Sequence, residues 1–564
     1  NNLNIVSSNL TNAGVLSAAN NINITSQIAS NILVNNVGGV LSALNGSVNI
    51  RDAAFVEKLN FALLGGDVLA KELNINTGEG ILNLQVNNLT PAISVFAGEG
   101  YISALSDIHV ATLQYSGDPI LNSGGDIVFQ GDQVPPDSGN YTLIATGSGT
   151  FSGRNAFIDP AHPATSINTT GLVLNLTGFV DLSGATISST SGVSITAGSG
   201  ITVGAISAPA GIKLNTSSGN ITAGNLTASS NFVEMQAASG SITSGALSAK
   251  AAVIVVSGKS FSAPSATVNG GGAVDIYVNQ SSPFVVGGGG IGTIVLTGTS
   301  PTGTGFVHIA NTGSGGLTLG STSAISINTP FQQSYLALDA STGVLTLPSG
   351  TISLDSSNFS VPAGVIALSA GQINANGTIL SASNTTGGYA GVVVVGTSSL
   401  NGGAGLTART NGAFGYTGVN GYGSVGITST PGAPVDNLHV SFSGLDLQPI
   451  TVTGQSLTLT SDGFQGQVIL DGSTMNLSGN ILLSANGGGG AAGYVQFVGN
   501  QIINNANVKA TANGVGSESG GIVNIQSLGA LSDLSLAENK LIAQATSGAS
   551  GGDGGQLNIV AGHL

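Results

Sequence analysis

One short phrase recurs along the middle of the chain and constrains the fold more than any other feature. It reads GITVGAISA from Gly200, GNITAGNLTAS from Gly219 and GSITSGALSA from Gly240, so successive copies begin 19 and 21 residues apart. A unit of this length cannot bury an apolar face by itself, but a stack of such units buries a continuous core. The phrase therefore indicates a repeat architecture rather than a series of unrelated domains.

A second series of segments alternates with the first and shows how each strand lies. Apolar residues occupy every second position in VSITA from Val193, IKLNT from Ile212, VEMQA from Val233 and VIVVS from Val253. Such alternation places one face of a strand in the core and the other in water. We expect each strand to pair in parallel and in register with its equivalent in the next unit, about 4.8 Å away.

These two observations predict an all-β chain folded as a parallel β-solenoid, or β-helix, with coils of roughly 20 residues. The alternative is a run of antiparallel β-sandwich domains. Sandwich domains need strand lengths and turns that vary within each domain, which fits poorly with one phrase at a constant spacing.

The strand pattern extends toward both ends of the chain. It predicts N-terminal coils over 1–130, regular coils over 171–400 and longer, glycine-rich coils over 437–564. In the charged segment 51–73, alternating apolar residues still predict a strand rather than a helix. Related segments are LNIVSS from Leu3, INITSQ from Ile22, VNIRDA from Val48, LVLNLTG from Leu172, VLTLPSG from Val344, LTLTSDG from Leu457, GYVQFVG from Gly493, GIVNIQS from Gly521 and GQLNIVA from Gly555.

Two segments interrupt the pattern. Residues 131–170 contain a Pro-Pro pair and the sequence IDPAHP, and proline is poor inside a paired strand, so we predict an irregular surface excursion there. Residues 401–436 are rich in glycine and hold Phe414, Tyr416 and Tyr422. We predict a loop or lateral hairpin in this second segment, and its three aromatic residues are candidates for binding to a surface.

The composition excludes several classes of protein. The chain has 564 residues, of which 41% are apolar and only 6% are charged, whereas ordinary soluble proteins carry about 25% charged residues. This much apolar sequence argues against disorder. The net charge of −15 and the ten scattered basic residues argue against a nucleic-acid partner. The longest apolar runs are far shorter than the roughly 20 residues of a membrane span.

The absence of cysteine removes any disulfide framework. A chain without cysteine, poor in lysine and rich in Ser, Thr and Asn is common among surface proteins, so we predict an extracellular or cell-surface location. The chain starts without Met and without a signal-like segment. We therefore expect either that a signal was removed or that the sequence is a fragment.

Three of the repeat segments resemble those of a known family. SGNITAGNLTA, GSITSGALSA and KLIAQATSGASGGDGGQLNIVAG are similar to repeats of filamentous haemagglutinin-type exoproteins, the large adhesins of two-partner secretion systems. The resemblance covers most of the chain as a degenerate pattern. It implies a right-handed parallel β-helix, export across the outer membrane and a surface or matrix role. The chain lacks the Asn-Pro-Asn-Gly type motif of that family's secretion domain.

The search for catalytic residues gives no candidate. Parallel β-helices include polysaccharide-cleaving enzymes, whose chemistry requires clustered carboxylates, but this sequence has no Asp-Asp pair and no His-Gly-His. Its five histidines lack metal-ligand spacing, and we interpret them as loop or wall residues. Asp462, Asp471 and Asp553 are interpreted as turn residues rather than calcium ligands. We predict no enzyme activity, no metal and no cofactor; a polysaccharide-degrading enzyme is the least favoured alternative.

The strand pattern reaches both ends of the sequence without a recognisable cap. An open coil at each end would allow head-to-tail contacts that repeat without closing. We therefore predict a secreted subunit that polymerises with copies of itself into a filament, adding about 25–28 coils and on the order of 130 Å per chain. The alternative is the rod-like stalk of a two-partner-secretion adhesin that binds host or neighbouring cell surfaces, or glycans, through its irregular loops. The predicted assembly residues are Leu3, Ile5, Ile22 and Ile24 in the N-terminal coils, and Leu557, Ile559 and Val560 in the C-terminal coil.

Overall fold

The computed structural model divides the chain into two compact units, Asn1–Ala249 and Lys250–Leu564, and each is described by itself. Neither sequence pattern predicted a division at this point. The structure describes residues 1–26, 31–52, 58–115, 117, 119–130, 140–144, 149–298, 305–401, 403–420, 425–428, 439–442, 450–454, 456–488, 491–504, 506–527, 534–536 and 541–560.

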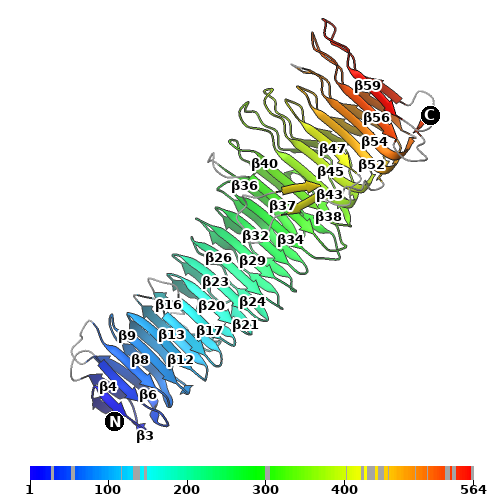
Figure 1. Ribbon diagram of the computed structural model, residues 1–564. Coiled ribbons are helices and arrows are strands. Elements are labelled where there is room, and N and C mark those ends of the chain that lie inside the picture. The colour runs from blue at the N-terminus through cyan, green and yellow to red at the C-terminus, as the bar shows by residue number, and fades with distance from the viewer. Residues whose placement is uncertain are drawn as a thin grey trace. The chain divides into compact units, whose positions relative to one another are not determined.

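The first unit is a parallel β-solenoid in which each regular coil contributes one short strand to each of three rows (Figure 1). In one coil these strands are β26 (Gly211–Thr216), β27 (Ile221–Ala223) and β28 (Leu226–Ala228), joined by short glycine- and asparagine-containing turns. Each pairs in parallel with its equivalent in the neighbouring coils. The predicted fold class is therefore confirmed.

The strands of the first unit follow row by row. The first row contains β1 (Leu3–Val6), β4 (Ile22–Ser26), β6 (Val40–Asp52), β8 (Asp67–Asn76), β11 (Ala92–Ala97), β13 (Ile108–Tyr115), β16 (Asn140–Ile144), β19 (Ser166–Thr169), β22 (Thr186–Ser189), β25 (Ile206–Ser207), β28 and β31 (Leu247–Ala249). The second contains β2 (Asn9–Thr11), β5 (Asn31–Asn35), β7 (Asn60–Leu64), β9 (Ile81–Val86), β12 (Glu99–Ala104), β14 (Pro119–Ser123), β17 (Gly149–Gly153), β20 (Leu172–Leu176), β23 (Gly192–Ala197), β26 and β29 (Phe232–Ala237). The third contains β3 (Val15–Ser17), the first parts of β6, β8 and β13, β10 (Asn88–Leu89), β15 (Ile127–Phe129), β18 (Ala156–Ile158), β21 (Phe179–Leu182), β24 (Gly200–Val203), β27 and β30 (Ile242–Ser244).

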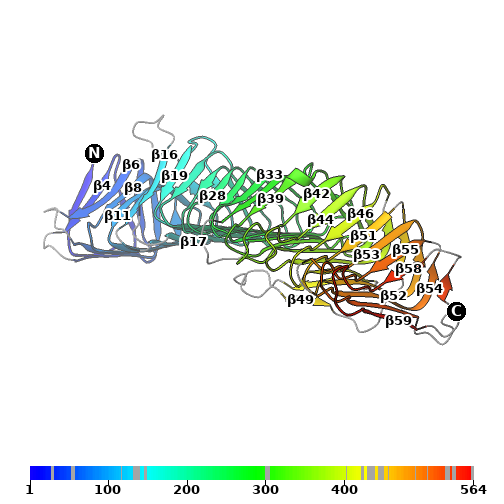
Figure 2. The same ribbon diagram turned by 90° about the horizontal axis from the view of Figure 1, so that it is seen from above.

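The second unit also has three rows. Figure 2 shows the strands of the third row from β42 to β58 lying side by side. The first row contains β32 (Ala252–Ser257), β34 (Ala273–Val278), β37 (Gly305–Asn311), β40 (Ser334–Asp339), β43 (Val365–Asn374), β45 (Val392–Asn401), β47 (Tyr416–Asn420), β52 (Gln467–Leu477), β54 (Tyr494–Asn504), β56 (Ile522–Ser527) and β59 (Gln556–Val560). The second contains β35 (Phe284–Val286), β38 (Leu317–Leu319), β41 (Val344–Thr346), the later parts of β43, β45, β52 and β54, β50 (Ile450–Thr453) and β57 (Leu534–Leu536). The third contains β33 (Phe261–Val268), β36 (Ile291–Thr297), the 3-10 turn η1 (Thr322–Ala324), β39 (Ile325–Asn328), β42 (Gly350–Ser353), β44 (Thr378–Ser381), β46 (Leu406–Arg409), β51 (Ser456–Thr460), β53 (Asn480–Ser484), β55 (Asn507–Thr511) and β58 (Leu541–Gln544).

The observed registers match the repeats seen in the sequence. Ile212 pairs with Val193 on one side and Val233 on the other, and Ile221 pairs with Ile201 and Ile242. Pairing of each copy with the next, in parallel and in register, is thus confirmed for these coils.

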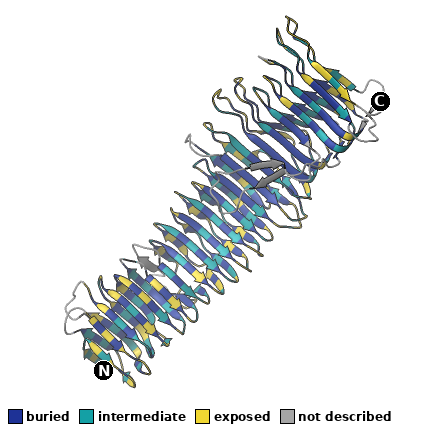
Figure 3. Cartoon of the chain, in the orientation of Figure 1, coloured by how far each residue is buried: buried dark blue, intermediate teal, exposed yellow. Residues whose placement is uncertain are grey.

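The core runs inside the coils as rows of buried apolar residues. Figure 3 shows buried residues alternating with more exposed ones along the strands. Ile212 and Leu214 of β26 are fully buried, while Lys213 between them is partly exposed. Burying each Ile, Leu or Val contributes about 1.5–3 kcal/mol. In the charged segment 51–73, Leu59, Phe61 and Leu63 are buried, and the last two belong to β7.

The predicted irregular excursion over 131–170 is corrected in its second half. β17, β18 and β19 continue the three rows, and β17 pairs with β14 before it and β20 after it. The prolines of IDPAHP do not interrupt this pairing because they lie in the turn between β18 and β19. Residues 131–139 and 145–148 lie outside the described residues.

The second predicted interruption, 401–436, is also narrower than expected. β46 and β47 are ordinary strands of the solenoid rows. The lateral hairpin consists of β48 (Val425–Thr428) and β49 (His439–Phe442), which pair antiparallel, and β48 lies against β43. The hairpin therefore begins later and ends later than the glycine-rich composition indicated.

The described part of the chain contains no helix with the length and apolar character needed to cross a membrane.

Candidate functional site

The N-terminal coil holds two of the predicted assembly residues on its first strand, β1. Leu3 and Ile5 of β1 pair with Ile22 and Ile24 of β4 and face the same side of the strand. Ile22 and Ile24 are fully buried, whereas Leu3 and Ile5 are only partly buried. β4 is covered on both sides, by β1 and β6, while β1 pairs with no other strand among the described residues.

The C-terminal coil has a similar edge. Leu557 and Ile559 of β59 stack on Val523 and Ile525, which are fully buried. Their own side chains remain 46% and 44% exposed. The structure places Val560 differently from the prediction: it pairs with Gln526 on the outer face, because side chains along a strand alternate between faces.

The two edge strands share one sequence. β1 reads LNIV and β59 reads QLNIV, so each carries an outward asparagine between an inward Leu and an inward Ile. Asn4 begins a row of outward amides, called here the amide row, in which each side chain donates to the preceding one. The Nδ2–Oδ1 distances are 2.7 Å from Asn23 to Asn4, 2.9 Å from Asn49 to Asn23 and 3.0 Å from Asn74 to Asn49. At the other end, Asn558 pairs with Asn524.

An exposed row of aromatic rings crosses three coils of the second unit. It contains Tyr389, Phe414 and Phe464 and is called the aromatic row. The rings of Tyr389 and Phe414 stack with centroids 5.8 Å apart, and Phe464 meets Phe414 edge-on at 5.1 Å. The three side chains are 56%, 50% and 37% exposed. Phe414 has φ 53°, a left-handed conformation that is unfavourable for a bulky residue.

The other two predicted aromatic residues do not join this row. Tyr416 begins β47 and packs against a buried cluster of Ala337, Ala367 and Val394. Tyr422 lies outside the described residues. Sequence reasoning missed Tyr389 and Phe464, which lie 25 and 50 residues from Phe414, because these spacings do not match the 20-residue period.

A ladder of side-chain to backbone hydrogen bonds holds one corner of the second unit, and it is called the corner ladder. In each step a side-chain oxygen accepts from the backbone N–H at the equivalent position of the next coil, over distances of 2.6–3.2 Å. Its members are Asp355, Ser383, Asn411, Asp462, Asn486, Asn513 and Thr546.

Asp462 serves as a hydrogen-bond acceptor within the corner ladder. Burial raises the pKa of this carboxyl, although Ser484 and the N–H of Asn486 donate to it. Asp553 is exposed. Within the described residues no group of three or more His, Cys, Asp or Glu side chains converges as a metal site would require.

Two other carboxylates are held in unusual surroundings. Asp471 of β52 accepts from Gln496 at 2.9 Å, yet burial raises its pKa to about 6, and its Oδ1 has no hydrogen-bond partner in the described structure. Asp275 lies 3.1 Å from Nδ1 of His308. His308 is buried on the outer side of β37 beside the rings of Tyr277 and Phe306, so it is a wall residue.

A small polar network in the first unit brings together histidines that are far apart in the sequence. Gln130 bridges His109 and Asp159 at 3.2 and 3.1 Å, and His162 lies 2.9 Å from Asp159. Burial favours a higher pKa for Asp159, but the bonds from His162 and the Ala161 N–H lower the pKa overall. The network links β13 to the turn after β18.

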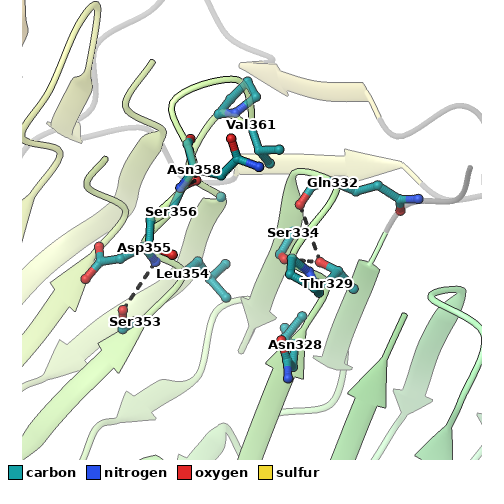
Figure 4. A pocket seen from close by; sticks show the side chains of 15 residues that line it. Asn328, Thr329, Gln332, Ser334, Ser353, Leu354, Asp355, Ser356, Asn358 and Val361 are labelled. Atoms are coloured by element: carbon teal, nitrogen blue, oxygen red, sulfur yellow. Dashed lines mark hydrogen bonds between the residues drawn. The ribbon is translucent and has the colours of Figure 1, made fainter. Parts of the chain in front are cut away.

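A polar cavity of about 190 Å³ lies in the second unit between the segments around Thr329 and Asp355 (Figure 4). Thr329 and Ser334 bond to each other on one side, and Ser353 to Asn358 form the other side. Asp355 is the first member of the corner ladder, and its Oδ1 already accepts hydrogen bonds from the Ser381 hydroxyl and the Ser383 N–H. The cavity has the size and polarity for ordered water or a very small polar ligand.

Comparison with protein-family models gives no match for this chain. Searches of curated proteins and of solved structures likewise give no significant match.

Proposed function

We propose that this chain is a structural subunit that assembles head to tail into an extracellular filament. The observation that carries the proposal is the likeness of its two edge strands, which both read LNIV and both leave an inward Leu and Ile partly exposed. A heterologous contact of this kind repeats without closing and therefore produces an open polymer.

The proposed joint is strand addition between copies. With β59 of one copy beside β1 of the next, Leu557 lies on Leu3, Ile559 lies on Ile5 and the exposed apolar surface becomes buried. Each of the four side chains would gain part of the about 1.5–3 kcal/mol that full burial provides. The joint would also place Asn558 beside Asn4 and continue the amide row from one copy into the next.

The resemblance of the repeats to filamentous haemagglutinin-type exoproteins supports the wider setting of this proposal. On that basis the chain acts at the cell surface or in the extracellular matrix, as a fibre rather than an enzyme, and without nucleic acid. The few charged side chains permit close lateral packing of such fibres.

The test uses two variants that each block one end. Ile5→Asp places a charge on the N-terminal edge and Ile559→Asp on the C-terminal edge, where partial exposure lets each variant fold. Each variant alone should remain monomeric. A mixture should form a dimer of one copy of each and nothing larger, measured by mass photometry and electron microscopy.

Ile81→Asp is the matched control, because Ile81 is 53% exposed on β9, away from both edges. It should form filaments like the unaltered chain. Filaments from either blocked variant alone would overturn the proposal. Dimers of a single blocked variant would show that like ends meet, which also contradicts the head-to-tail arrangement.

The aromatic row favours a second candidate function, that of an adhesive stalk. Exposed rings and the left-handed backbone at Phe414 cost conformational free energy. A subunit that only forms end-to-end contacts with other copies has no need of them. Replacing Tyr389, Phe414 and Phe464 together by Ser should abolish attachment to cell surfaces or immobilised glycans if the row is adhesive. Phe331→Ser is the control, because Phe331 is 54% exposed elsewhere in the same unit; equal attachment by all three proteins would contradict this function.

A further inference from the structure

A groove on the first unit contains polar groups arranged in two parallel rows. The cavity measures about 480 Å³ and crosses β4, β6, β8, β11 and β13. The first row continues the amide row through Asn23, Asn49, Asn74, Ser94 and Thr112. The second row, two positions along each strand, contains Arg51, Asn76, Phe96 and Gln114.

The pairing registers explain why these side chains form one continuous surface. Equivalent residues in a parallel solenoid lie about 4.8 Å apart, so five strands span about 19 Å. The hydrogen bonds between Asn23, Asn49 and Asn74 fix the planes of their amides. A register shift between β11 and β13 inserts Ala111 opposite the step from Ile93 to Ser94. Such a bulge redirects the side chains that follow it, here Thr112 and Gln114.

The chemistry of the lining selects the kind of ligand. Amide and hydroxyl groups both donate and accept hydrogen bonds, which suits a chain of hydroxyl groups. Phe96 is 44% exposed and offers a flat apolar face, as pyranose rings require. Arg51 is the single cation among the lining residues, and the whole chain carries a net charge of −15, so a polyanion would be repelled.

We propose that this amide groove binds an extended neutral polysaccharide, with its sugar rings running across the strands. The strand spacing of about 4.8 Å is close to the length of one pyranose unit in an extended chain, so successive units meet equivalent groups. Phe96 stacks on one ring, while Asn76, Gln114 and the amide row bind hydroxyl groups. A filament of such subunits would carry one glycan site per copy.

The experiment measures binding to a soluble mixed-linkage β-glucan and to dextran by affinity electrophoresis, with polygalacturonate as the anionic comparison. Retardation by at least one neutral polymer is expected. Phe96→Ala should weaken that binding at least tenfold, Gln114→Ala should weaken it several-fold, and Phe96→Tyr should retain it because the ring remains. Phe179→Ala is the matched control, since Phe179 is 42% exposed on β21, outside the groove.

The same measurements on the Ile5→Asp chain separate this inference from the proposed assembly, because the groove does not depend on polymerisation. Thermal melts exclude unfolding as the cause of any loss. Absence of binding to either neutral polymer overturns the inference. Binding to polygalacturonate alone, lost in Arg51→Ala, also overturns it, as does equal weakening by Phe96→Ala and Phe179→Ala.

Discussion

The regular coils near the end of the first unit and the long coils of the second unit share close glycine corners but differ in the extent of their polar ones. In the first unit the corners bring backbones into close contact at glycine: a Cβ added at Gly198, Gly219 or Gly240 would overlap a backbone oxygen of the preceding coil. In the second unit the corner ladder fills a wider turn with Asp, Ser and Asn side chains. Equally close glycine contacts occur in the second unit, at Gly391 and Gly493, and in the first unit Asn220 and Asn225 each accept from a backbone N–H of the next coil. The two units therefore differ in how far such polar steps continue from coil to coil, and not in whether they use glycine.

The outer faces of the two units differ as well. On β26 and β29 the outer positions are occupied by Lys213 and Glu234, which form a partly exposed ion pair at 3.1 Å. On β37, β40 and β43 the corresponding side of the sheet is buried, with His308, Ala337 and Ala367 in one row. Strands β43 and β45 therefore begin with the apolar runs VIAL and VVVV, because both of their faces are covered there.

The largest expected effect on stability comes from a substitution at a glycine corner. Gly219→Ala should lower the free energy of unfolding of the first unit by about 3 kcal/mol, because its Cβ would meet the backbone of Ser199 rather than a movable side chain. Chemical denaturation measures the change. Gly14→Ala is the control, since nothing lies within 4 Å of its added Cβ. Similar stability of both variants would show that close backbone contact is not what limits the short coils.

The next effect concerns a partly buried carboxyl group on the outer face of the second unit. Burial raises the pKa of Asp471 from 3.8 to about 6, so the folded chain favours the protonated carboxyl. The contribution of this carboxyl to stability is therefore fully present below the unfolded pKa near 3.8 and is lost as pH rises through about 6. Asp471→Asn should therefore stabilise the unit at pH 7.5 by about 2–3 kcal/mol. The gain should vanish below pH 4 in thermal melts across this range. A gain in stability that does not depend on pH would contradict a raised pKa for Asp471.

The smallest of the three effects concerns the corner ladder. Asn486→Ala removes the acceptor for the Asn513 N–H and the donor to Ser484, and should cost about 1–2 kcal/mol. Asn507→Ala is the comparison, because Asn507 makes one exposed bond to Asn480 and should cost less. Hydrogen exchange at the Asn513 amide would report the loss directly. Unchanged protection there would mean that the ladder contributes little to the corner.

Much of the fold could be predicted because its signal repeats locally. Alternation in IKLNT and its neighbours defines the inward positions, and the constant spacing defines their partners, as with Ile212 between Val193 and Val233. The prediction failed where composition alone was used. Pro160 and Pro163 lie in a turn rather than a loop excursion, and the glycine-rich start of 401–436 forms strands β46 and β47.

The candidate sites show the limit of the same reasoning. Leu3, Ile5, Leu557 and Ile559 could be chosen as candidates because they belong to the repeat. The partners of Phe414 were missed because coils of the second unit have unequal lengths, with a hairpin inserted between β47 and β50. The two rows of the amide groove were also not predicted, because a slip of one residue in any register would move a side chain to the other face.

The sequence by itself determined the parallel solenoid, the inward rows and the pairing of each regular coil with the next, since these follow from a period of two within strands and a period near 20 between them. Only the tertiary structure decided which outward side chains meet. That outcome depends on the length of every corner, on bulges such as the one at Ala111 and on which outer faces are covered, and none of these repeats along the chain.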